Sequence, residues 1–359
     1  MKLPVRILMV LLCIALIAAI PFVVSSPNML YDVKMELMNE EDEGDDEIDF
    51  GRLFFSTAFA EEELEVEELE DGQFASHPEW KLPFDFSAGQ EPKADHYTDN
   101  SYEDESIRVR FETRDFDEGT RIFIAYVQIA DASQLRTGVY KPDKLASSQA
   151  KPIMSISNKY HPVVAINGDN YTNDPKKTTF EYRMGEMIRS SGNMKKDILI
   201  IDDQGDFHLY IKSEGLSLGK NKKGKNVWMK AEDWEKENGR KLVNAFTFGP
   251  ALVKDGELVE YDEGYGYNPG GREPRTAIGQ MGKLSYVLVV VQAEDRSGSS
   301  GMSQRKLAEF MYELGCKQAF NLDGGNTAGM VFGDKEYKGM LNGGDRDITD
   351  IIYFASSQP

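Results

Sequence analysis

The stretch Ser285–Ala293 reads Ser-Tyr-Val-Leu-Val-Val-Val-Gln-Ala and is a nearly continuous apolar run of strand length. Such a run is typical of a strand that is buried on both faces of a parallel or mixed sheet. A second apolar run, Lys317–Leu322, follows after a segment with helical spacing at residues 303–314. Two strands joined by a helix are expected to lie parallel with a right-handed crossover. The sequence therefore predicts an α+β or α/β fold whose mixed sheet core contains a parallel βαβ unit.

The segment between the two runs has the start and stop signals of a helix. Ser303 fits the N-cap position, and Gly315 supplies the C-terminal stop. Apolar residues recur between them at helical spacing: Leu307, Phe310, Met311 and Leu314. We therefore expect one amphipathic helix that covers a face of the sheet.

The chain opens with a segment that resembles a membrane signal. Lys2 and Arg6 precede the 18-residue uncharged run Ile7–Val24, which is near the lower limit for crossing a bilayer. We expect residues 1–25 to be an uncleaved signal anchor or a cleaved signal peptide. The positive-inside rule then places the remainder outside the cytoplasm. The expected location is the cell membrane, as a single-pass protein with its catalytic domain outside, or secretion if the segment is cleaved.

Most of the net negative charge lies in one tract. Residues 36–71 carry 17 Asp and Glu against one basic residue, Arg52, in a chain of formal net charge −20. This composition suits a solvated segment, so we assign residues 26–102 to an acidic, largely disordered spacer. The folded domain is expected at residues 103–359, where strand-like runs such as Ile107–Phe111 and Arg121–Ala130 appear. No basic patch stands out, which argues against nucleic acid as a partner.

Cysteine and histidine give no sign of a metal centre. Of the two cysteines, Cys13 lies in the apolar N-terminal run, which leaves Cys316 without an obvious partner. The four histidines show no spacing typical of zinc ligands.

Three apolar runs end in polar clusters. The run Pro162–Ile166 enters Asn167-Gly168-Asp169-Asn170, the run Ser285–Ala293 enters Glu294-Asp295-Arg296, and Lys317–Leu322 enters Asp323-Gly324-Gly325. If these strands are parallel neighbours, their carboxyl ends gather the three clusters into one site. The alternative for each alone is a simple turn, or a surface ion pair for Asp295-Arg296.

Two arginines fit an anion site. Arg275 opens the segment Arg275-Thr276-Ala277-Ile278-Gly279 after a glycine-rich loop at residues 264–271, and Arg346 lies near the C-terminus. A guanidinium offers a rigid fork of donors that matches phosphate oxygens. The alternative for both is a solvated position at the end of a strand or in a loop.

An ordered series of motifs resembles the phosphodiester glycosidase family over roughly residues 105–356. The series comprises Phe248-Gly249-Pro250-Ala251-Leu252 with Asp255-Gly256, Arg275-Thr276-Ala277-Ile278-Gly279, Gly301-Met302-Ser303, Leu314-Gly315-Cys316, Asn321-Leu322-Asp323-Gly324-Gly325 and Arg346-Asp347-Ile348-Thr349-Asp350. The Asn321–Gly325 segment is the most specific. Two segments depart from the family pattern, because Asn326-Thr327 replaces glycine and serine and Asp169-Asn170 interrupts an Asn-Gly-Gly-aromatic motif. Both departures leave the sugar and the aglycone unassigned.

The resemblance implies hydrolysis of the bond between the sugar C1 and a phosphate oxygen, in cell-surface glycan metabolism. Asp323 and Asp295 are the candidates for nucleophile or general base. The candidate substrate-binding residues are Asn167, Asp169, Arg275, Arg296, Asn321, Gly324, Gly325, Thr327, Arg346 and Asp350. The expected partners are a glycan or sugar-phosphate substrate and the membrane. No cofactor is required, although a divalent cation such as calcium is compatible with these residues.

Two other functions stay open at this point. One is a non-catalytic glycan- or wall-binding module on the same fold, which the two departures from the family pattern favour. The other is a metal-dependent phosphodiesterase, in which Asp169, Asp295 and Asp323 would hold a divalent cation and the P–O bond would break.

Overall fold

The computed structural model describes residues 74–145, 150–169, 180–190, 196–212, 219–220, 226–227, 231–260, 262–266, 268–295 and 297–359. The expected membrane segment at residues 7–24 and the acidic tract at residues 36–71 lie outside these ranges. No helix in the described ranges has the length and apolar character needed to span a bilayer.

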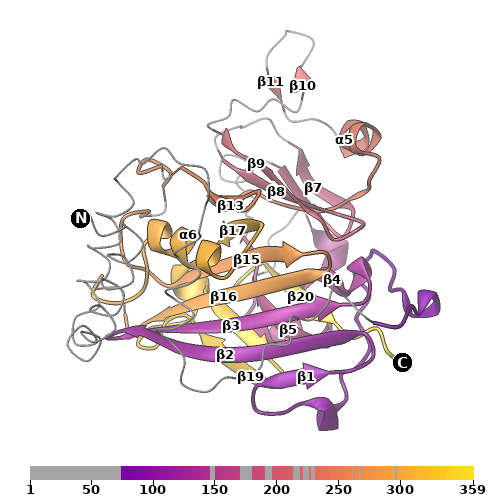
Figure 1. Ribbon diagram of the computed structural model, residues 1–359, viewed down its shortest axis with the longest axis horizontal. Coiled ribbons are helices and arrows are strands. Elements are labelled where there is room, and N and C mark those ends of the chain that lie inside the picture. Colours follow the sequence, from indigo (N-terminus) through magenta and orange to yellow (C-terminus); the bar gives the residue numbers. More distant parts are fainter. Residues whose placement is uncertain are drawn as a thin grey trace, which may run out of the picture. The chain divides into compact units, whose positions relative to one another are not determined.

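The largest layer is an eight-stranded sheet (Figure 1). Every pairing between its strands is antiparallel. In hydrogen-bonding order the strands are β1 (Ser101–Glu103), β2 (Ile107–Asp117), β3 (Thr120–Ile129), β16 (Ser285–Ala293), β15 (Arg275–Gly282), β17 (Gln318–Leu322), β13 (Ala251–Lys254) and β14 (Glu257–Leu258).

The expected parallel βαβ unit is wrong, although its strands and helix are in the expected places. β16 and β17 run in the same direction but are not neighbours, because β15 lies between them and pairs antiparallel with both. β15 and β16 form a hairpin in which Gly282 pairs with Ser285, and Leu284 in the turn has a φ of 53°. This local hairpin takes the edge of β16 that a parallel β17 would need. β17 then adds to the free edge of β15.

The apolar run of β16 is explained by burial on both of its faces. Tyr286, Leu288 and Val290 point into a core shared with other strands, while Val287 and Val289 point to the opposite face. Helix α6 (Gln304–Glu313) covers that opposite face with Leu307, Phe310 and Met311. Ser303 caps this helix by accepting a hydrogen bond from the Lys306 backbone amide, which confirms the predicted N-cap.

The second layer is a five-stranded antiparallel sheet. It packs on the face of the large sheet that α6 leaves open, through residues such as Val164, Ile166 and Phe354. The short helix α4 (Ile153–Ser157) lies against its outer face. Its strands in order are β19 (Lys335–Lys338), β18 (Gly329–Phe332), β5 (Pro162–Asn167), β20 (Asp350–Ala355) and β4 (Leu135–Val139).

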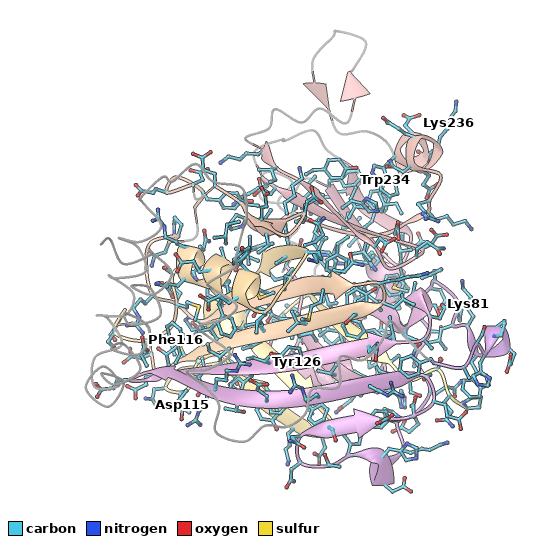
Figure 2. The ribbon with its side chains drawn as sticks, in the orientation of Figure 1. Lys81, Asp115, Phe116, Tyr126, Trp234 and Lys236 are labelled. Atoms are coloured by element: carbon cyan, nitrogen blue, oxygen red, sulfur yellow. The ribbon has the colours of Figure 1, made fainter. Side chains whose placement is uncertain are left out.

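A third sheet of five antiparallel strands carries helix α5 (Ala231–Asn238). Trp234 of this helix is fully buried and donates a hydrogen bond to the Tyr210 hydroxyl at 2.6 Å, whereas Lys236 points outward (Figure 2). The strands are β7 (Glu186–Ser190), β6 (Phe180–Arg183), β12 (Leu242–Phe246), β8 (Ile198–Asp202) and β9 (Phe207–Tyr210), and a separate pair is β10 (Gly219–Lys220) with β11 (Asn226–Val227).

The fold begins before the predicted boundary at residue 103. Leu82 is buried, and Gln90 forms a β-bridge with Ser356 near the C-terminus. The fully buried guanidinium of Arg136 donates to the carbonyl oxygens of Pro83, Asp85 and Ser87 at 2.8, 2.9 and 3.0 Å. The stretch from Leu82 to Gln90 therefore belongs to the domain and not to a spacer.

Candidate functional site

Two of the three predicted polar clusters meet where strands of different sheets end. The Asn167 side chain at the end of β5 donates to the Asp323 carbonyl at 2.7 Å, and the Asp323 amide donates to the Gly168 carbonyl at 3.3 Å. The other amide atom, Asn167 Oδ1, accepts from Thr276 Oγ1 at 2.8 Å and from the Gly329 amide at 3.1 Å. The Asn167 side chain therefore ties the end of β5 to the end of β17 and also to Thr276 of β15 and Gly329 of β18.

Asp323 presents its carboxylate at this junction. Its Oδ2 accepts from Arg346 Nη2 at 2.7 Å and its Oδ1 accepts from the Gly324 amide at 3.0 Å. Burial, which leaves the residue 6% exposed, raises the pKa of Asp323, and the charge of Arg346 opposes that rise. The Arg346 side chain is 52% exposed. The pair is thus a nearly buried carboxylate beside a guanidinium that reaches solvent.

The two glycines after Asp323 are required by close backbone contact. A Cβ on Gly324 would lie 2.6 Å from the Pro274 carbonyl oxygen, and Gly325 has a φ of 63°. Thr327 Oγ1 donates to the Gly324 carbonyl at 2.6 Å and closes the turn. In this structure Thr327 and both glycines therefore shape the turn that holds Asp323.

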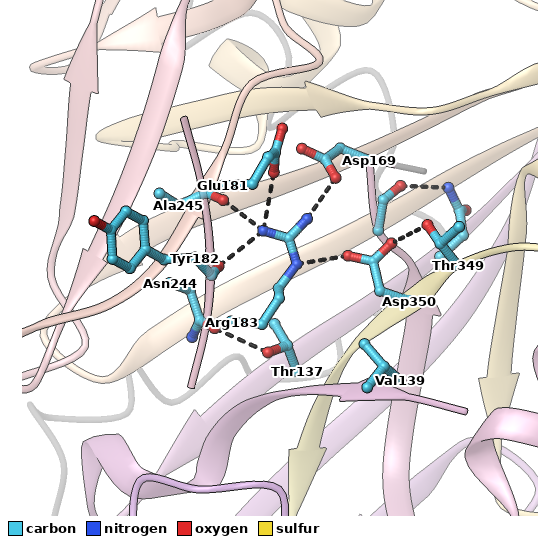
Figure 3. Close-up of polar contacts among 12 residues, drawn as sticks. Thr137, Val139, Asp169, Glu181, Tyr182, Arg183, Asn244, Ala245, Thr349 and Asp350 are labelled. Atoms are coloured by element: carbon cyan, nitrogen blue, oxygen red, sulfur yellow. Dashed lines mark hydrogen bonds and ion pairs between the residues drawn. The ribbon is translucent and has the colours of Figure 1, made fainter. Parts of the chain in front are cut away.

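A buried charge cluster lies beside this junction (Figure 3). Arg183 of β6 is fully buried, and its guanidinium donates to Asp169 Oδ1 and to Asp350 Oδ2, the latter at 2.7 Å. Glu181 Oε2 lies 3.2 Å from Arg183 Nη1. Gly168 has no room for a Cβ, which would lie 2.4 Å from Asp350 Oδ2. One guanidinium thus faces three carboxyl groups, two of which were predicted as site residues.

Burial perturbs the acidity of two carboxyl groups in this cluster. Burial first, and then the charge of Asp169, raises the pKa of Glu181 well above its ordinary value. Burial also raises the pKa of Asp350, against the opposing charge of Arg183. Burial disfavours the charge on Arg183, but the three carboxyl groups hold its pKa above the usual range. Burial therefore favours the protonated forms of Glu181 and Asp350 within the cluster.

Glu181, Arg183 and Thr247 were not predicted from the sequence. Thr247 joins the cluster because its amide donates to Asp169 Oδ2 at 2.9 Å and its hydroxyl donates to Glu181 Oε1. The available signal was the strand Phe180–Arg183, in which two charged residues alternate with two aromatic ones. All four of its residues are buried, so the charged face of this strand needed partners.

Arg275 occupies a different environment from that of a phosphate clamp. It is buried, and its guanidinium donates to the carbonyl oxygens of Met302 at 2.9 Å, Asn268 at 2.8 Å and Gly271 at 2.9 Å. These contacts hold the glycine-rich loop and the segment before α6 against the start of β15. The geometry therefore gives Arg275 a structural role.

Asp295 and Asn321 have polar partners other than Asp323 and Arg346. Asp295 caps its own turn, since its Oδ1 accepts from the Ser297 amide at 2.7 Å, and hydrogen bonds from Ser297 lower its pKa. Within the described ranges no hydrogen bond or ion pair joins Asp295 to Asp323. Asn321 Nδ2 donates to the Gly249 carbonyl at 2.8 Å. Arg296 lies outside the described residues.

The three carboxylates proposed for a cation are not grouped. Among the residues that the structure describes, no set of three His, Cys, Asp or Glu side chains has an arrangement that could hold a metal ion. Asp169 faces Arg183 instead, and Asp295 lies in its own exposed turn. A metal-dependent reaction through these three side chains therefore has no support in their placement.

The fold and the site define an antiparallel β-sheet protein that presents an aspartate–arginine pair where strands of two sheets end. A family model for phosphodiester glycosidases matches residues 160–355, more than half of the chain. The chain therefore belongs to the phosphodiester glycosidase family.

Known proteins that resemble the chain are distant. The catalytic domain of zebrafish N-acetylglucosamine-1-phosphodiester α-N-acetylglucosaminidase, auto-inhibited by its pro-peptide, has a TM-score of 0.51 at 15% identity, covering 75% of this chain and 87% of that one. A hypothetical protein from Synechocystis has a TM-score of 0.46 at 17% identity, with 69% and 62% covered. The SPβ prophage-derived uncharacterized protein YomE of Bacillus subtilis is 22% identical over 210 residues, which are 57% of this chain and only 30% of that relative.

Proposed function

We propose that this protein is an extracytoplasmic glycosidase that hydrolyses the sugar C1–O bond of a sugar-1-phosphate diester in a cell-surface glycan. The observation that carries this proposal is the pairing of Asp323 with Arg346 at 2.7 Å, at a strand junction of a phosphodiester glycosidase fold. The proposal of a membrane anchor rests on the N-terminal sequence alone.

Arg346 is suited to hold the phosphate of the substrate. One of its five N–H donors is directed at Asp323, and the half-exposed side chain can offer others to phosphate oxygens. A phosphate ester is a weakly basic leaving group, so it needs little help from a general acid. Its departure is favoured mainly by a fixed positive charge, which Arg346 supplies.

Asp323 is suited to act on the sugar side of the bond. An oxocarbenium-like transition state gains from a carboxylate close to C1, acting as nucleophile or as general base. Arg346 favours the ionised form of Asp323 despite its burial. The tight turn at Gly324, which packs against the Pro274 carbonyl, holds this carboxylate in place.

The buried cluster around Arg183 holds the ends of the strands that carry the site. It connects β6, through Arg183 and Glu181, to Asp169 after β5 and Asp350 of β20. These contacts fix the backbone at Gly168, whose carbonyl accepts from the Asp323 amide. We assign the cluster a positioning role and not contact with the sugar.

The replacement Asp323→Asn tests the assignment. We expect a loss of turnover of at least about 100-fold on a panel of sugar-1-phosphate methyl diesters, because the amide cannot act as nucleophile or base. The midpoint of thermal unfolding should stay close to that of the wild type, since Asn keeps the turn. Asp345→Asn is the matched control, because Asp345 lies in the loop of Arg346 but bonds to Lys338. Equal activity of wild type and Asp323→Asn would remove Asp323 from the reaction.

A further inference from the structure

The loop that carries Arg346 is exposed along its whole length. Residues 341–347 are all exposed, and they include the pair Gly343-Gly344, which has no Cβ to restrain its backbone. A cation on such a loop can adopt many orientations, and fixing one of them on binding costs conformational entropy. The pairing of Arg346 with Asp323 at 2.7 Å therefore needs contacts that hold the loop.

Asn326 supplies two of these contacts. Its side-chain Nδ2 donates to the Gly344 carbonyl at 2.6 Å, and its backbone carbonyl accepts from the Arg346 amide at 2.9 Å. These two bonds hold the loop on both sides of Asp345. The side-chain bond acts directly on the glycine pair, where the backbone is least restrained.

Other attachments of the loop lead to other parts of the fold. The Asn342 amide donates to the Glu294 carbonyl at 2.6 Å, at the end of β16. Lys338 pairs with Asp345, but both side chains are half-exposed, so solvent weakens this pair. Asn326 instead joins the loop to the turn of the candidate nucleophile.

Asn326 and Asp323 lie on one short stretch of backbone. The 3₁₀ turn η6 (Gly325–Thr327) begins two residues after Asp323 and contains Asn326. The backbone from Asp323 to Asn326 is closed into a ring by two contacts of Arg346, which are its amide bond to Asn326 and its guanidinium bond to Asp323. Such a ring fixes the separation of the two charged groups only while the loop backbone stays in place.

We propose that Asn326 is a positioning residue, which holds Arg346 in the orientation that meets both Asp323 and the phosphate of the substrate. The part that concerns phosphate rests on the proposed function. A guanidinium that is already oriented loses less entropy when it binds an anion. The glycine that stands at this position in the family pattern has no side chain to donate, so the bond to Gly344 is a feature of this chain.

Hydrogen exchange of the full chain tests the positioning role without any substrate. Asn326→Ala removes the donor to Gly344, so exchange of the Arg346 amide should become at least about fivefold faster. Asn326→Ser should behave in the same way, because its hydroxyl is too short to reach Gly344. The control is Asn342→Ala, which keeps the backbone bond of that residue and should leave the exchange unchanged. Unchanged exchange in the Asn326 variants would overturn the proposal whether or not the protein hydrolyses a diester.

Phosphate binding tests whether Asn326 acts through Arg346. Inorganic phosphate, titrated calorimetrically against the full chain, should bind at least about fivefold more weakly to Asn326→Ala than to the wild type. In an Arg346→Ala background the same substitution should have no further effect, because no guanidinium is left to orient. An equal loss in both backgrounds would overturn the proposal. Failure of the wild type to bind phosphate would refute the proposed function, while the exchange measurement would still decide the positioning of Arg346.

The pH dependence of turnover gives a readout that a purely structural role would not move. The charge of Arg346 faces the Asp323 carboxylate, beside the neutral donors of Gly324 and Thr327, and opposes the rise of its pKa on burial. A less well-placed guanidinium opposes that rise less, so the pKa of Asp323 should be higher in Asn326→Ala. Because ionised Asp323 is the reactive form, the acidic limb of kcat/KM should move to higher pH. An acidic limb at the wild-type position would overturn the proposal.

Discussion

Glu181 is a buried carboxyl group whose pKa is raised well above its ordinary value by burial and by the charge of Asp169. It is fully buried and shares one guanidinium, that of Arg183, with Asp169 and Asp350. Three ionised carboxylates would leave an uncompensated buried charge, which the low-dielectric interior disfavours strongly. A neutral Glu181 that accepts from the Thr247 hydroxyl reduces that excess from two negative charges to one.

We therefore expect the stability of the protein to depend on pH through Glu181. Its folded-state pKa is raised, so between about 4.5 and that raised pKa the folded state binds more protons than the unfolded state. The free energy of unfolding should consequently fall as the pH rises, by about 1.4 kcal/mol per pH unit at most for one proton. Above the raised pKa this contribution becomes constant.

The substitution Glu181→Gln should remove this slope, because glutamine imitates the protonated acid with one acceptor and one donor end. Denaturant unfolding between pH 5 and pH 9 measures it, with Glu186→Gln on the exposed side of β7 as the control. The variant should gain stability relative to the wild type as the pH rises. Parallel curves for the two proteins would mean that Glu181 is ionised in the fold.

Single residues of this site differ in how far the sequence reveals them. Asn167 and Asp323 lie at strand ends and Arg346 lies in the last of the family motifs, and the structure brings these three together. Glu181 and Arg183 lie in a four-residue strand. The charged partner Asp350 of Arg183 is far away in the sequence. No local sequence pattern predicts such distant partners. Burial of a charged strand face becomes evident only after the sheets are assembled.

At the scale of elements, hydrophobic patterning located the segments but not their neighbours. β16 has the predicted bounds, and α6 and β17 differ by one residue at their ends. The pattern did not predict that β15 lies between β16 and β17. A strand buried on both faces has the same apolar pattern in parallel and antiparallel sheets. The hairpin turn before β16 contains Lys283 and Leu284, which lack the Asn-Gly or Asp-Gly signal of such turns.

Arg275 links three elements, so we expect its loss to affect folding more than substrate binding. Arg275→Ala would leave the carbonyl oxygens of Asn268, Gly271 and Met302 without their donor and should lower the free energy of unfolding by about 2 to 4 kcal/mol. Arg275→Lys should restore only a part, because an ammonium cannot reach three carbonyls in one plane. Denaturant unfolding measures both. A stable alanine variant with lost turnover would instead place Arg275 at the substrate.

At the scale of the whole molecule, the segment before β1 contributes to the fold. A protein that begins at residue 74 should unfold cooperatively, because it keeps the contacts of Leu82 and Arg136. One that begins at residue 100 should lose about 3 kcal/mol or more, since the buried guanidinium of Arg136 loses three carbonyl partners. Thermal and denaturant unfolding measure the stability of the two proteins. Equal stability would restore the boundary near residue 103.

The central claim is that the protein breaks the bond between a sugar C1 and a phosphate oxygen. Hydrolysis of a sugar-1-phosphate methyl diester in ¹⁸O-water, followed by mass spectrometry of both products, tests it most directly. We expect ¹⁸O in the released sugar and none in the phosphomonoester, because water attacks carbon in a glycosidase. Label in the phosphate product would show P–O cleavage and contradict the account, and the absence of product from every diester of the panel would indicate a binding module.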